Sequence, residues 1–136
     1  MTHATCQTFS FLTRRWCITR ALELITSGPN AAHLVERADI TRLDPFLPST
    51  KPTLGYVKLL EFPVDPTHAA TVDLTTPIVV ARLLSAAGDD LGAMVIDGWH
   101  RIYRARAEGL THLPAHVLTA DTERAARIPV SLARRS

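Results

Sequence analysis

Five consecutive residues, Asp97-Gly98-Trp99-His100-Arg101, combine an acid, a glycine and two basic side chains where a strand-like run gives way to a helix-like one. A sharp turn from a strand into a helix leaves the first backbone N–H groups of the helix without intrahelical partners. Those N–H groups, the positive end of the helix dipole and an arginine together make a site for an anion. The turn therefore predicts a phosphate-bearing ligand, and a nucleotide is the class that we expect.

Three side chains of the turn each have a functional interpretation and an ordinary structural alternative. Gly98 lets an anion approach the backbone closely, or it serves only a tight turn. Arg101 suits a bidentate pair with phosphate, or it forms an exposed ion pair on the helix. His100 can hydrogen-bond a phosphate or act as an acid near neutral pH, or it only packs. We expect the functional role for Gly98 and Arg101 and leave both open for His100.

The remaining candidates are acids, one aromatic residue and one further histidine. Asp97 can hold Mg²⁺ or accept a hydroxyl proton, or it can cap the helix. Trp99 can stack on a base, although core packing is the more common fate of a tryptophan. Asp65, His68 and Asp73 lie in the loop after the first expected strand and can line the same pocket, although a plain surface position is commoner for each.

The elements that must position this turn form an α+β pattern. Apolar runs and turn signals predict strands at about 56–64, 77–84, 93–96 and 113–118, with a loop at about 87–92. Helical spacing predicts helices at about 13–25, 31–38, 100–108 and 119–128, the third ending at Gly109 and the last capped by Asp121 or Thr122. A short helix or turn is expected at 65–68. This order is typical of a small mixed β-sheet with helices.

Residues 44–55 hold three prolines and predict a loop or linker. We therefore expect residues 1–50 to form a helical or irregular N-terminal extension and residues 51–136 to form the compact domain. The 136 residues are 46% hydrophobic and 21% charged, which suits one globular domain.

The net charge of +2 gives only weak support to nucleic acid as a partner. The two cysteines, Cys6 and Cys17, fit no usual zinc or redox spacing, so we expect no disulfide framework, as in a reducing cytosol. Neither a signal-peptide pattern nor an apolar run of the ~20 residues that a membrane helix needs is visible. We expect a cytoplasmic protein with no membrane partner.

Three segments follow one another in a recurrent order. They are the strand Pro77-Ile78-Val79-Val80, the turn Val95-Ile96-Asp97-Gly98-Trp99-His100-Arg101, and the step Gly109-Leu110-Thr111-His112-Leu113-Pro114-Ala115-His116-Val117 into the next strand. Together they resemble the ParB/sulfiredoxin-like superfamily, whose members share a strand, a Gly-X-His-Arg type turn, a helix and a further strand. The resemblance implies a ParB/sulfiredoxin-like α+β fold and nucleotide binding at the turn.

Within that superfamily, the turn is most similar to the Asp-Gly-His-His-Arg turn of free-serine kinases, which use it in phosphoryl transfer. The resemblance implies ATP, ADP or CTP with Mg²⁺, and a small molecule as the acceptor. It assigns Gly98, Trp99, His100 and Arg101 to the nucleotide, Asp97 to Mg²⁺, and Asp97, His100 and Glu61 to catalysis, with Glu61 as the base. Trp99 stands where a sulfiredoxin carries its nucleophilic cysteine, so we do not expect sulfiredoxin chemistry.

The sequence leaves several functions open. A nucleotide-binding small-molecule kinase or nucleotide hydrolase is the interpretation that we favour. A non-catalytic ParB-type module for DNA partition or regulation is the alternative, although no helix-turn-helix segment is visible after the last expected strand. A ParB-like nuclease is disfavoured because no cluster of carboxylates for two metals is visible. The oligomeric state is also open, a homodimer included.

Overall fold

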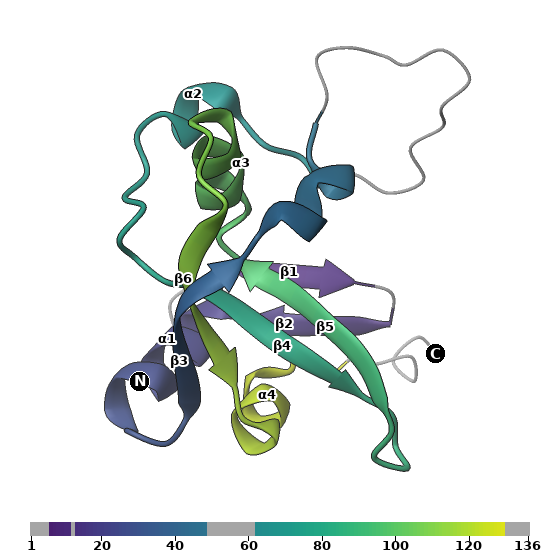
Figure 1. Ribbon diagram of the computed structural model, residues 1–136. Coiled ribbons are helices and arrows are strands. Elements are labelled where there is room, and N and C mark those ends of the chain that lie inside the picture. Colours follow the sequence, from purple (N-terminus) through teal and green to yellow (C-terminus); the bar gives the residue numbers. More distant parts are fainter. Residues whose placement is uncertain (1–5, 12, 49–61, 130–136) are drawn as a thin grey trace, which may run out of the picture. The chain divides into compact units, whose positions relative to one another are not determined.

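The computed structural model describes residues 6–11, 13–48 and 62–129, which form an α+β fold with two sheets (Figure 1). A two-stranded antiparallel sheet pairs β1 (Thr8–Phe11) with β2 (Arg14–Cys17). A four-stranded mixed sheet has the order β3-β6-β4-β5, with bounds Ala32–Asp39, His112–Leu118, Ile78–Leu84 and Asp90–Asp97. The helices are α1 (Ile18–Ser27), η1 (Thr41–Phe46, a 3₁₀-helix), α2 (Pro66–Ala69), α3 (Trp99–Ala107) and α4 (Ala120–Ala126). None of these helices is both long and apolar enough to cross a membrane.

The described chain divides into two compact units. Unit 1 takes its residues from within 1–34, 79–97 and 116–136, and unit 2 takes its residues from within 35–78 and 98–115. The expected boundary at residue 50 falls among residues that the structure does not describe. Residues expected to form an N-terminal extension contribute β1, β2 and α1 to unit 1.

The β4–β5 hairpin delivers the chain to the predicted turn. The two strands are antiparallel, and Val79 lies opposite Asp97, the last residue of β5. The loop between them is held by Ser85, whose Oγ accepts hydrogen bonds from the N–H groups of Ala87 and Asp89. The buried apolar residues lie at the start of β4 and near the end of β5, and β5 begins at Asp90, inside the loop expected at 87–92.

The core of unit 1 is built around a buried carboxylate. Trp16 is fully buried, and its indole N–H donates to Glu123 Oε2 at 2.8 Å. Glu123 is only 3% exposed and also accepts two hydrogen bonds from the guanidinium of Arg127. Burial raises the pKa of Glu123, but the bonds from Arg127 and Trp16 outweigh it, so the net shift of this pKa is downward. The ionised carboxylate therefore ties α4 to β2.

The two cysteines are bonded to each other, which corrects the expectation of no disulfide. The bond joins Cys6, just before β1, to Cys17, the last residue of β2, with Cα atoms 5.4 Å apart. The pairing of β1 with β2 brings the two residues together. A spacing of 11 residues carries no such information by itself, which is why the sequence pattern missed it.

Further expectations about secondary structure need correction, in whole or in part. The segment 31–38 forms most of β3 instead of a helix, because it pairs with the distant strand β6. The helix expected at 13–25 starts only at Ile18, after β2, and Thr119, rather than Asp121 or Thr122, caps α4. Most of the strand expected at 56–64 lies outside the described residues, and 62–64 are not in a strand. The strands at 77–84, 93–96 and 113–118 and the helix at 100–108 are confirmed to within a few residues.

The Glu123→Gln variant tests the buried carboxylate. We expect the change to lower the free energy of unfolding at pH 7 by about 3 kcal/mol, because the buried side of Arg127 loses its counter-charge. Since the folded pKa of Glu123 lies below its ordinary value of 4.5, its contribution is complete above that pH. The contribution is then lost as the pH falls through the folded pKa, so the difference between wild type and variant narrows in acid.

Urea denaturation at a series of pH values measures this difference. Glu108→Gln is the matched control, since Glu108 is half exposed and pairs with Arg104 on the surface of α3. We expect the control to cost less than about 1 kcal/mol. Equal losses in the two variants would contradict the assignment.

Candidate functional site

The predicted turn does form, and Gly98 starts helix α3 with a positive φ of 113°. A Cβ on this residue would lie 2.5 Å from Ile78 Cγ2 and 2.9 Å from Ile78 Cβ. Both the backbone conformation and the close approach of Ile78 therefore require glycine here. These two observations support the structural alternative for Gly98, which is a tight turn.

Trp99 lies within an aromatic cluster of unit 2. It is 7% exposed, stacks on Phe62 with ring centroids 4.4 Å apart, and meets the ring of Phe46 edge-on at 6.4 Å. These contacts place the indole in the core, which is the structural alternative for this residue. Its role as a stacking platform for a base stays a prediction.

Arg101 is held beside the turn by backbone carbonyls. Its Nη1 donates to the carbonyl oxygens of Thr76 and Pro77, at 3.1 and 2.9 Å. The half-buried guanidinium therefore clamps the loop that leads into β4. Backbone carbonyls carry no sequence signature, so the sequence pattern did not reveal this second role.

The other arginines of α3 also bond within unit 2. Arg104 donates to Glu108 and to the carbonyl of Val72, and Arg106 forms a bidentate pair with Asp44. These bonds attach α3 to the loop between α2 and β4 and to η1.

His100 joins two residues that the sequence only weakly associates with it. The backbone N–H of Asp65 donates to His100 Nε2 at 3.2 Å, and the ring of His68 meets the ring of His100 edge-on, 4.6 Å away. Packing of α2 on α3 brings these residues together (Figure 1). The sequence left Asp65 and His68 open between the pocket and a plain surface position, and the structure brings both of these exposed residues to His100.

The surroundings of His100 favour its neutral imidazole. Burial, and next the neighbouring His68, lower the pKa of His100 below its ordinary value of 6.5, and Asp65 offsets this only in part. Because Nε2 accepts a hydrogen bond, the neutral ring carries its proton on Nδ1. His100 therefore offers one N–H donor to a ligand rather than a fixed positive charge.

The acidic residues predicted for the site lie in different parts of the chain. Asp97 ends β5 in unit 1 and is joined to the turn through the chain itself. Glu61, the predicted base, lies outside the described residues. Asp73 accepts hydrogen bonds from the N–H and the hydroxyl of Thr75, which lower the pKa of the Asp73 carboxyl. Within the described residues, no group of three or more His, Cys, Asp or Glu side chains is placed to hold a metal ion.

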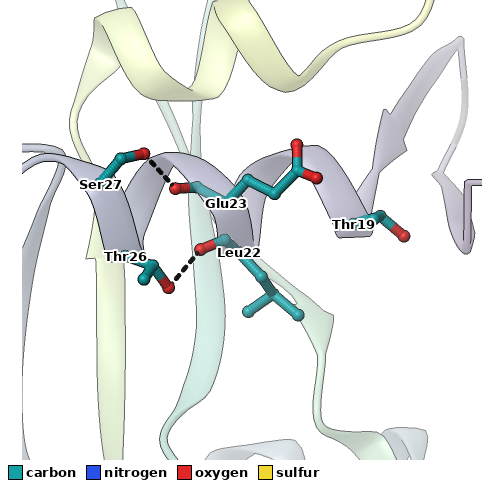
Figure 2. Close-up of a pocket in the computed structure, with 5 residues that line it drawn as sticks. All are labelled: Thr19, Leu22, Glu23, Thr26 and Ser27. Carbon is teal, nitrogen blue, oxygen red and sulfur yellow. Dashed lines mark hydrogen bonds between the residues drawn. The ribbon is translucent and has the colours of Figure 1, made fainter. Parts of the chain in front are cut away.

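A groove of about 510 Å³ runs along the exposed face of α1, lined by Thr19, Leu22, Glu23, Thr26 and Ser27 (Figure 2). The hydroxyls of Thr26 and Ser27 donate to the carbonyls of Leu22 and Glu23, one turn earlier. These two hydroxyls therefore face their own helix, and the sequence pattern gave no sign of this groove.

A comparison of the chain with protein-family models, with curated protein sequences and with solved structures finds no match. The resemblance of the turn to the ParB/sulfiredoxin-like superfamily therefore remains a prediction that rests on residues 77–117.

The Gly98→Ala variant tests the constraint on the turn. We expect it to lower the free energy of unfolding by about 3 kcal/mol, because a positive φ and a clash with Ile78 act together. Gly92→Ala is the matched control: its φ is +110°, but nothing lies within 4 Å of its added Cβ. The control should cost about 1 kcal/mol. Thermal and urea denaturation measure both, and an equal cost would show that packing against Ile78 contributes nothing.

The pKa of His100 is accessible to an NMR titration of the imidazole resonances. We expect a midpoint below 6.5, and we expect His68→Gln to move it upward only part of the way, because burial remains the larger cause. His33→Gln, an exposed change on β3, serves as control and should leave the midpoint of His100 in place. A midpoint above 6.5 in the wild-type protein would contradict the described environment.

Proposed function

We propose that the protein binds the phosphate groups of a nucleotide at the start of α3. The observation that carries the proposal is the content of the first turn of that helix. It holds His100 and Arg101 and no acidic side chain, and Gly98 before it has no side chain to cap the helix. The helix dipole and two nitrogen-rich side chains therefore favour an anion at this end.

The histidine pair supports the same ligand. His68 and His100 lie edge-to-face beside the helix start, and both rings can donate an N–H to phosphate oxygens. A phosphate that approaches His100 would favour its charged form and raise the pKa that burial holds down. We therefore propose that protons are taken up on binding and that affinity rises as the pH falls from 7 towards 6.

Arg101 supports the proposal through its fixed position. Its guanidinium is anchored to the carbonyls of Thr76 and Pro77, so little side-chain entropy remains to be lost when a ligand arrives. Arg101 is a poor residue for a test, however, because its removal also releases the loop before β4.

We propose that Mg²⁺ binds together with the nucleotide and not to the protein alone. This ion is usually bound by one or two carboxylates together with substrate phosphates and water. Asp97, directly before the turn, is the carboxylate that we propose for this contact, and Mg²⁺ would neutralise phosphate charge there. Transfer to a small-molecule acceptor and a cytoplasmic location belong to the same proposal.

Isothermal titration calorimetry with ATP, ADP, CTP and GTP, each with Mg²⁺, tests the proposal. We expect at least one nucleotide to bind, and His100→Ala to weaken it about tenfold through the lost hydrogen bond to a charged group. His68→Ala should weaken it by a smaller factor. The matched control is His33→Ala, which should bind as wild type does.

Two results would overturn the proposal. One is the absence of binding heat with all four nucleotides at two temperatures. The other is an affinity that falls equally in the His100 and His33 variants.

A further inference from the structure

The disulfide of unit 1 lines a cavity. Cys6 and Cys17 both line a space of about 380 Å³ between the start of α1 and the end of α4, together with Thr19, Arg20, Glu23 and Arg127. This volume lies in the range of small-molecule sites. We propose that the Cys6–Cys17 bond is redox-active and exchanges with a small, carboxylate-bearing thiol that enters this cavity.

The two sulfur atoms differ in access. Cys6 is exposed, whereas Cys17 is 5% exposed and is covered by the fold of unit 1. A thiolate from solvent therefore reaches the Cys6 sulfur first. Attack on Cys6 makes Cys17 the leaving group.

Cys17 occupies a position that stabilises a leaving thiolate. It is the N-cap residue of the ten-residue helix α1, and its Sγ accepts a hydrogen bond from the Arg20 N–H at 3.3 Å. The first turn of α1 holds no acidic side chain that would repel a thiolate there. A thiolate at a helix start is stabilised in this way, and a stabilised thiolate leaves faster in exchange.

The backbone holds Cys6 in place without the bond. The residue after it, Gln7, accepts a hydrogen bond from Ile18 N–H at 2.7 Å and donates one to Thr19 Oγ1 at 3.2 Å. Thr8 then pairs with Cys17 in the β1–β2 ladder. The reduced cysteines therefore stay close enough to bond again, and the cycle needs no unfolding.

The exchange balances in two steps. A small thiolate attacks Cys6 Sγ, forms a mixed disulfide with it, and expels the Cys17 thiolate. A second small thiolate attacks the small-molecule sulfur of that mixed disulfide and releases Cys6. Two small thiols are oxidised to their disulfide, and the protein disulfide gains two electrons and two protons. The reverse sequence oxidises the protein.

The charges around the cavity favour a carboxylate on the thiol. Arg127 is already paired with the buried Glu123, so the exposed Arg20 is the cation that we assign to the ligand. Among the described residues of the cavity wall, Glu23 is the one acid. The groove of Figure 2 shares Thr19 and Glu23 with this cavity, so the two spaces are neighbours along α1 and offer room for a tripeptide-sized thiol.

The first experiment uses the wild-type protein in glutathione buffers of graded redox poise, with the thiols trapped by a maleimide and counted by mass spectrometry. We expect reversible reduction by two electrons under native conditions, with the far-ultraviolet circular dichroism unchanged. A disulfide that reacts only in denaturant, or a protein that unfolds on reduction, would overturn the proposal.

Variants then test which cysteine sulfur the small thiolate attacks and whether the charge of Arg20 attracts that thiol. Cys17→Ser should accumulate a mixed disulfide with glutathione on Cys6, and Cys6→Ser should form at least about tenfold less on the covered Cys17. Arg20→Gln should slow reduction by glutathione about two- to fivefold, but not reduction by uncharged 2-mercaptoethanol. Arg37→Gln, an exposed change on β3, is the control of equal charge. Equal labelling of both cysteines would overturn the assigned direction, and equal slowing with both thiols would overturn the role of Arg20.

Discussion

The contact between Gly98 and Ile78 decides where helix α3 begins. A side chain at residue 98 would collide with the start of β4, so the chain must pass here as bare backbone with a positive φ. The residues directly after Gly98 are positioned by this turn. Trp99 packs in the aromatic cluster, and His100 contacts His68 of α2. A single close approach thus sets one end of the core of unit 2 and the candidate site together.

The arginines of α3 show how one residue type can serve structure where the sequence suggests binding. Each of the three bonds to a carbonyl or a carboxylate of the same unit, so together they attach α3 to the loop between α2 and β4 and to η1. Arg101 alone lies in the first turn, where an anion would meet it. A ligand there would find a guanidinium already held in place by the loop before β4.

Local signals in the sequence predicted the turn well. The elements that depend on pairing between distant segments could not be predicted in this way. The apolar run into Asp97, the glycine and the helical spacing after it all act within a few residues, so the hairpin, α3 and β6 are confirmed. The strand β3 was missed because its partner β6 lies far along the chain. The disulfide was missed because only the β1–β2 pairing aligns its cysteines. Within the site, the sequence offered Asp65 and His68 only as residues that can line the pocket, and the carbonyl partners of Arg101 carry no signature in the side chains.

The hydrogen bond from Asp65 to His100 has a consequence for the start of α2. A ring nitrogen can accept a bond only while its lone pair is available, and an imidazolium has none. Charging of this histidine therefore leaves the amide of Asp65 without its acceptor, although the Asp65 carboxylate still caps α2 through the Thr67 N–H. Protonation of one ring thus frees the backbone N–H of the residue at which α2 begins.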